Sequence, residues 1–221
     1  MSIVEPGVAP SGLVARVKAI LMQPAATWDV IDSEPATIGG LYRSYIIPLA
    51  AIGPICQFLH NLLFGMGVPG LISIRISPIW LGVNLIVSYV FSLAIIYVFA
   101  LIIDALAPTF GGTKNQIQAF KVAAYAPTAG WVAAVLLLVP MLGILAVLGG
   151  LYSLYLLYRG LPRLMKTTED KALPYTALVV VAGLVVGLVA GAIWGSVSMM
   201  ARGSMFGGPL AAQSHISGNV N

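Results

Sequence analysis

The sequence predicts an all-α, polytopic membrane protein with five transmembrane helices and a short amphipathic N-terminal cytosolic segment. Only 8% of its 221 residues are charged and 59% are hydrophobic, whereas soluble domains carry about 25% charged residues. Apolar stretches of about 20 residues, long enough to cross the hydrocarbon layer of a bilayer, recur along the chain. Lys and Arg residues gather beside these stretches, where they set membrane topology.

The residues before the membrane domain fall into two parts. Residues 1–12 are predicted to be a flexible lead, without the basic start and apolar core of a cleavable signal peptide. Residues 13–41 are predicted to form an amphipathic segment. It is expected either to lie in the lipid headgroup layer or to pack on the cytosolic ends of the membrane helices. Its apolar residues include Leu13, Val17, Ile20, Trp28 and Ile31, and the charged residues beside them include Arg16, Lys18, Asp29 and Asp32.

Residues 42–200 form the predicted five-helix membrane domain. The apolar stretches place its spans at about residues 44–65, 79–103, 122–139, 142–158 and 174–197. Ser77 directly before Pro78 marks the start of the second span, and the capping-box spacing of Thr113 and Gln116 marks the start of the third helix. The small, polar residues 201–221 are predicted to be a disordered tail.

The basic residues predict the orientation, because Lys and Arg beside membrane spans stay on the cytosolic side. A cytosolic N-terminus leaves only Arg75 and Arg202 outside and, with five spans, places the C-terminus outside. The basic residues then on the cytosolic side are Arg16, Lys18, Arg43, Lys114, Lys121, Arg159, Arg163, Lys166 and Lys171.

A polar cluster is predicted where the first two spans face each other. Its side chains recur every three or four residues, so each set lies on one helical face. They either form interhelical hydrogen bonds, worth about 0.6 kcal/mol each, or line a hydrated path in a small transporter or channel. The cluster consists of Gln57, His60, Asn61, Asn84, Ser88 and Ser92.

Glycine recurs at every fourth position of the fifth span, which favours close packing against another helix. The partner is either a helix of the same bundle or a second subunit in a homo-oligomer. The helix-packing glycines are Gly183, Gly187, Gly191 and Gly195.

The stretch between the fourth and fifth spans is the most basic in the chain. Its charges are explained by topology alone, or they also contact anionic lipid headgroups at about 1 kcal/mol per residue. The candidate headgroup contacts are Arg159, Arg163, Lys166 and Lys171. We further expect Asp104, at the cytosolic end of the second span, to form an ion pair with Lys121 or with Arg163.

No catalytic pattern is present, so we expect neither an enzyme nor a cofactor. The sequence has no His, Cys or carboxylate group with metal-ligand spacing, no phosphate-binding glycine loop and no Gly-x-Ser-x-Gly nucleophile turn. Cys56 is the single cysteine, which excludes an intramolecular disulfide. The net charge of +4 lies beside the spans, so nucleic acid is not an expected partner; the lipid bilayer is.

Several stretches resemble the bacterial branch of the Yip family, named for Ypt-interacting proteins. The similar stretches are 24–28, 119–127, the hairpin at Pro140 and Gly143, 150–158 and 159–171, within residues 13–197. The resemblance implies five membrane helices with a cytosolic N-terminus in the bacterial inner membrane, and no catalytic residues. It favours a membrane-organising or protein- or lipid-interaction module over the transporter or channel.

Eukaryotic members of this family are associated with Rab and Ypt GTPases, but GTPase binding is not expected of this chain. Its N-terminal segment is only about 40 residues long, too short for the long cytosolic region of those members. Their Asp-Leu-Tyr-Gly-Pro motif is reduced here to Leu41 and Tyr42, followed by Arg43.

Overall fold

The computed structural model describes residues 12–68, 72–74 and 77–206. Five helical segments in this part of the chain are long and apolar enough to cross a membrane, so the predicted all-α, multi-pass fold class is confirmed. The segments are Ile38–Phe64, Pro78–Phe110, Gln116–Leu138, Leu142–Met165 and Glu169–Ser196. The chain forms two compact units, Met1–Ala182 and Gly183–Asn221, and each is described by itself.

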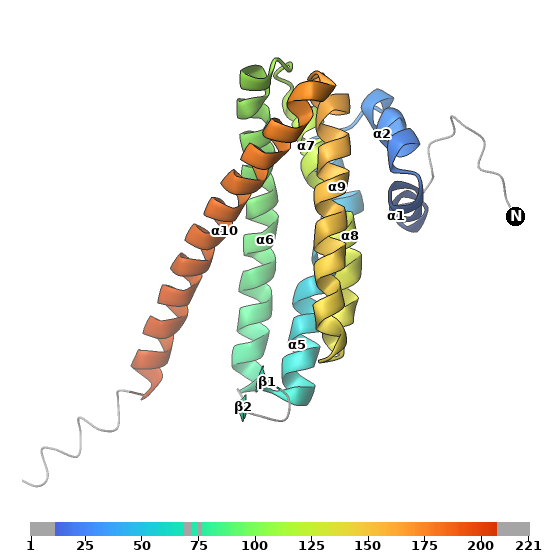
Figure 1. Cartoon of the computed structure of the whole chain (residues 1–221). Helices are drawn as coiled ribbons and strands as arrows, with labels where there is room; N and C mark the ends of the chain where they lie inside the picture. The colour runs from blue at the N-terminus through green and yellow to red at the C-terminus, as the bar shows by residue number, and fades with distance from the viewer. Residues whose placement is uncertain (1–11, 69–71, 75–76, 207–221) are drawn as a thin grey trace, which may run out of the picture. The chain divides into compact units, whose positions relative to one another are not determined.

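Two short helices precede the first membrane segment, α1 (Leu13–Met22) and α2 (Pro24–Ser33). Their apolar residues Ile20, Trp28 and Ile31 are fully buried. α2 packs against α9 (Ala146–Met165), and the Tyr152 hydroxyl of α9 donates a hydrogen bond to the Leu21 carbonyl at 2.7 Å. The buried side of this helix pair therefore faces the bundle. Figure 1 shows α2 beside the end of the bundle that α7 and α9 reach.

The first membrane segment is assembled from short pieces because two prolines interrupt its hydrogen bonding. It consists of α3 (Ile38–Leu41), a π-helical turn (Tyr42–Ile46), α4 (Ile47–Ala50) and α5 (Ile52–Phe64). At the break the Tyr89 hydroxyl donates to the Ile47 carbonyl at 2.8 Å. Such a bond from a neighbouring helix satisfies a carbonyl that water cannot reach in a membrane.

The loop predicted after the first segment contains a small hairpin, in which β1 (Met66–Val68) pairs antiparallel with β2 (Ile72–Ile74). The second segment then begins at Pro78, as predicted, and α6 (Pro78–Leu106) continues as a 3₁₀ turn, Ala107–Phe110. It therefore extends beyond the predicted end at residue 103. Arg75, one of the two basic residues predicted on the non-cytosolic side of the membrane, is not among the described residues.

The third segment consists of α7 (Gln116–Tyr125), α8 (Thr128–Ala133) and a 3₁₀ turn (Ala134–Leu138). The N-cap of α7 is Asn115, whose side chain accepts a hydrogen bond from the Gln118 amide at 3.3 Å. The predicted cap, Thr113, instead donates its amide to the Met165 carbonyl at 2.8 Å. The helix therefore begins two residues later than a cap at Thr113 predicts, and its polar first turns precede the apolar stretch at residues 122–139.

The third and fourth segments pack closely on each other. A 3₁₀ turn (Leu142–Leu145) follows the predicted tight turn and leads into α9. A Cβ placed on Gly149 would lie 2.2 Å from the Ala133 Cβ and 2.8 Å from the Ala129 carbonyl oxygen. The Ser153 hydroxyl accepts a hydrogen bond from the Gly130 amide at 2.9 Å. Glycine at position 149 therefore allows α8 and α9 to approach at backbone distance.

The ends of the fourth and fifth segments differ from the prediction. α9 continues through Pro162 to Met165, and α10 (Glu169–Phe206) begins five residues before residue 174. The predicted basic loop is therefore mostly helical, and its reversal is confined to residues 166–168, with Lys166 in the left-handed region at φ 57°. α10 also continues past the predicted end at 197 into the stretch predicted to be disordered; residues 207–221 lie outside the described part.

Candidate functional site

Acidic residues of α2 meet the basic end of α9, and this contact defines the candidate site. Arg163 forms an ion pair with Asp29, and Lys166 Nζ lies 2.5 Å from Asp32 Oδ2. Two of the four candidate headgroup contacts are therefore already paired with carboxylates of the same chain. The amphipathic segment predicts that Asp29 and Asp32 share one side of α2, but the sequence does not show which cations they meet.

Lys121 holds the C-terminal end of α2. Its side chain is only 3% exposed, and Nζ donates to the carbonyl oxygens of Ile31 at 2.7 Å and Glu34 at 2.6 Å. These carbonyls lie at the end of a helix, where the last carbonyls have no partner within the helix and the dipole favours a cation. A single Lys within an otherwise apolar stretch is the sequence signal for this contact.

The predicted ion pairs of Asp104 are wrong. Lys121 is turned toward α2 and Arg163 toward Asp29, so neither cation reaches Asp104. Asp104 is itself buried, and its Oδ1 has no hydrogen-bond partner within the described residues. The prediction failed because it paired charges by their depth in the membrane, whereas α2 supplies nearer partners for both cations.

A second buried cation joins α1 to the chain that follows α2. Arg16 is 9% exposed although its sequence position predicts the polar side of α1. Its Nη2 lies 2.5 Å from Glu34 Oε1, and its guanidinium lies 5.9 Å from the ring centre of Tyr125. A buried guanidinium needs such a counter-charge because desolvation of an unpaired charge is costly. α1 and α2 are therefore held by charged groups as well as by apolar contact.

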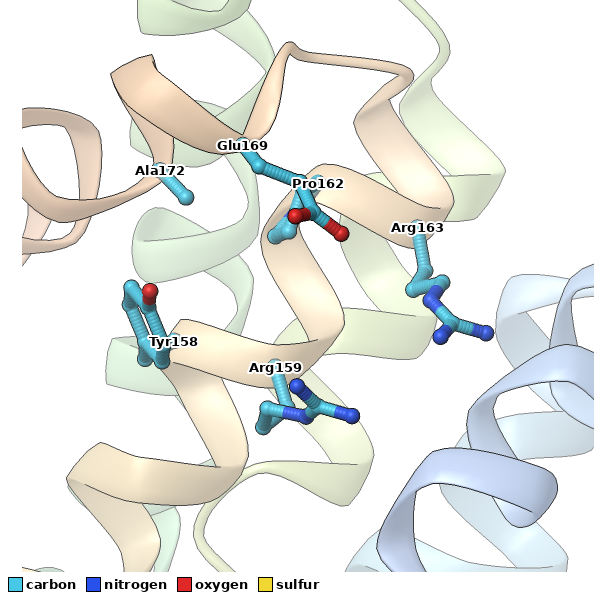
Figure 2. Close-up of a pocket in the computed structure, with 6 residues that line it drawn as sticks. All are labelled: Tyr158, Arg159, Pro162, Arg163, Glu169 and Ala172. Carbon is cyan, nitrogen blue, oxygen red and sulfur yellow. The ribbon is translucent and has the colours of Figure 1, made fainter.

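A small pocket opens between α9 and the first turn of α10, within the unit Met1–Ala182. Its volume is about 60 Å³, and its lining residues are Tyr158, Arg159, Pro162, Arg163, Glu169 and Ala172. Figure 2 shows Arg163 extending toward the N-terminal helices, whereas Arg159 emerges one turn earlier on α9. The side chains of Arg159 and Glu169 form no hydrogen bond and no ion pair within the described part of the chain, although Glu169 is attracted electrostatically to Arg163. The last of the candidate headgroup contacts, Lys171, lies outside this pocket, with Nζ near Gly111.

The predicted polar cluster is divided between its two helices. Gln57 Nε2 donates to Asn61 Oδ1 at 3.1 Å within α5, and the hydroxyls of Ser88 and Ser92 donate to carbonyls three residues earlier within α6. Across the described residues, no hydrogen bond joins the α5 set to the α6 set. His60 Nδ1 is buried without a hydrogen-bond partner in the same part of the chain. Asn84 is half-buried on α6.

The glycines of the fifth span belong to the unit Gly183–Asn221. All four lie in α10, where they keep the spacing that predicts one common face. Their packing partner stays a prediction.

The family of the chain follows from its similarity to known proteins. The family model for the Yip1 domain matches residues 18–204. The chain belongs to the Yip1 domain family. The match includes all five membrane segments and α2, so the family resemblance seen in the sequence is confirmed.

Two curated members of similar length support the assignment to this family. The inner membrane protein YohC of Escherichia coli K12 is 24% identical over 178 residues, which cover 78% of this chain and 90% of YohC. YohC of an Escherichia coli O6:H1 strain matches with the same values. No solved structure matches the chain. The five apolar segments and the inner membrane relatives together support a bacterial inner membrane location for this Yip1 domain protein.

Proposed function

We propose that this Yip1 domain protein is a non-enzymatic module that organises the inner membrane by contacting lipids and membrane proteins through the end of the bundle where α1 and α2 dock. One observation carries the proposal. α1 is fixed to the bundle on one side, yet it presents two large apolar side chains outward, Val14 at 79% and Met22 at 70% exposure. An amphipathic helix with this arrangement suits the boundary between headgroups and acyl chains.

The proposed orientation places this end in the cytosol, with the N-terminus inside and the C-terminus outside. The basic residues Arg159, Arg163, Lys166 and Lys171 support it because they all lie in or beside the reversal between α9 and α10. Lys and Arg near membrane helices favour the cytosolic side. α1 would then face the inner leaflet.

Photo-crosslinking in cells tests the proposed contact of α1. A photo-reactive residue is placed at position 14, at position 22 or, as the matched control, at the exposed position 18 on the same helix. We expect lipid adducts or one discrete protein adduct at positions 14 and 22 in clear excess over position 18. Equal labelling at all three positions would contradict an apolar contact of α1 with the bilayer or with a partner.

A small transporter or channel is the second candidate function. It is favoured by His60 of α5, whose Nδ1 is buried and has no hydrogen-bond partner among the described residues. A polar group of this kind within a membrane often marks a functional path. Proteoliposomes that contain wild type or the Gln57→Leu/Asn84→Leu variant are compared in flux assays for protons, monovalent ions and small neutral solutes. Flux above that of empty liposomes, lost in the variant, would favour this candidate over the interaction module.

A further inference from the structure

We propose that the pocket between α9 and α10 binds the headgroup of a phospholipid that carries a primary ammonium, as in phosphatidylethanolamine. The proposal deepens the proposed function, on which it rests, because it names a site and a lipid class. Its chemical basis is a pair of opposite charges that line the pocket and form no ion pair within the described residues, Arg159 and Glu169.

The charges of the pocket fit a headgroup that has both signs. Arg163 also lines it, but Asp29 neutralises this guanidinium. Among the six lining residues, Arg159 is the cation and Glu169 the anion whose side chains form no ion pair within the described part of the chain; the electrostatic attraction of Glu169 is to the already paired Arg163. A guanidinium binds phosphate oxygens through paired N–H donors, and a carboxylate accepts hydrogen bonds from an ammonium. A headgroup with a phosphate and no cation would instead place its charge beside Glu169, where like charges repel.

The volume of the pocket limits what enters it. About 60 Å³ holds roughly four water-sized groups at about 15 Å³ each. This is enough for the charged end of a headgroup, and the glycerol and acyl chains must lie outside. Tyr158 and Pro162 of α9 also line the pocket, and Figure 2 shows Glu169 near Pro162, so the headgroup would meet an aromatic and an aliphatic side chain.

α9 offers a path for the acyl chains on the same face. Leu148, Leu151 and Tyr155 are 61%, 57% and 43% exposed. They precede Tyr158 and Pro162 at spacings of three and four residues, which place all five on one side of the helix. Ten residues separate Leu148 from Tyr158, a rise of about 15 Å at 1.5 Å per residue. This is half of the roughly 30 Å hydrocarbon thickness, which is the depth of one leaflet.

Native mass spectrometry of the full-length protein with added lipids tests the proposal. The probes are phosphatidylethanolamine, phosphatidylglycerol and phosphatidylcholine with identical acyl chains. We expect ethanolamine lipid to bind several-fold more than either of the others. Phosphatidylcholine has no N–H to donate to Glu169, and the headgroup of phosphatidylglycerol has no cation.

Variants of the two charges separate this site from general lipid contact. Arg159→Gln should lower binding of the ethanolamine lipid about tenfold, the effect of losing one charge-assisted hydrogen bond. Glu169→Gln should lower the ratio of bound phosphatidylethanolamine to bound phosphatidylglycerol. The matched controls are Lys171→Gln and Asp170→Asn, two neighbouring charges on α10 that do not line the pocket; both should keep the wild-type ratio.

Three results would overturn the proposal. One is a preference of the wild type for the glycerol lipid, and another is a ratio that Glu169→Gln leaves unchanged or that Asp170→Asn shifts equally. In either case, the proposed function would still hold if Lys171→Gln and Arg159→Gln weakened lipid binding to the same extent. The lipids would then bind to a diffuse basic surface and not to the pocket. The third is that the protein retains none of the three lipids. If positions 14 and 22 also showed no excess photo-crosslinking, the proposed function would be contradicted as well.

Discussion

Gly160 of α9 lies directly against the indole of Trp28 in α2. A Cβ at position 160 would stand 2.7 Å from Cζ2 of the Trp28 ring, and Trp28 itself is fully buried. The Trp28 ring also makes an edge contact with Tyr125 of α7, with ring centres 6.3 Å apart. The docked position of α2 therefore depends on the absence of a side chain at one point of α9.

The variant Gly160→Ala should weaken this docking. The added methyl group forces the fully buried Trp28 ring to move, and such overpacking costs about 1–3 kcal/mol. We expect a lower thermal unfolding midpoint in detergent and faster proteolysis between α1 and α3. Gly150→Ala is the matched control, because position 150 is on the same helix and has no heavy atom within 4 Å of the added Cβ in the described structure. Equal stability of both variants would argue against the Trp28 contact.

Replacing Lys121 by methionine should release the end of α2. The variant keeps the length of the side chain but leaves the Ile31 and Glu34 carbonyls without their donor, which costs about 1–3 kcal/mol. We expect increased hydrogen exchange of amides in α2 and little change in α6. Lys114→Met, at an exposed position just before α7, removes the same charge and should leave exchange in α2 at the wild-type level. Unchanged exchange in the Lys121 variant would contradict the role of this lysine.

The glycine face of the fifth span should be sensitive to bulk. Gly187→Leu or Gly191→Leu places a large side chain where helices are predicted to approach closely, so we expect lower yield or a change of size in detergent. Size-exclusion chromatography with light scattering measures both. A smaller particle would indicate a homo-oligomer through α10, whereas loss of folded protein at unchanged size would indicate packing within one chain. Wild-type yield and size for both variants would refute the prediction.

The orientation has a direct test. A phosphatase that is active only outside the cytosol should be active when fused after Asn221, and a fluorescent protein that folds only inside should be dark there. The same pair of reporters fused before Met1 should give the opposite result. A C-terminal fusion that is active only in the cytosol would overturn the arrangement of five spans with the N-terminus inside.

Apolar length predicted the number and order of the membrane segments because the hydrocarbon layer imposes that length on any helix that crosses it. It did not predict where the helices end. Residues 159–165 continue α9 although they carry two arginines and a proline, because their apolar residues Leu161 and Leu164 are buried against the core. Helix ends outside the hydrocarbon layer depend on such tertiary contacts, which hydropathy does not record.

The candidate site was predictable in composition but not in its pairing. The sequence identifies Arg163 and Lys166 as prominent cations and places Asp29 and Asp32 on one side of α2. Which cation meets which carboxylate depends on how α2 docks beside α9. In each pair, the two residues are 134 positions apart in the sequence. Gly160 allows this docking, but nothing in the sequence around it indicates that the Trp28 ring packs there.

The docking of α2 on α7 and α9 also determines when the protein can be completed. A ribosome makes α2 before α7 and α9, yet the partners of its carbonyls and carboxylates are Lys121, Arg163 and Lys166, which emerge much later. Chains are made from the N-terminus at about 5–20 residues per second, so α2 waits several seconds for these cations. The first helices to be synthesised are therefore among the last to reach their final positions.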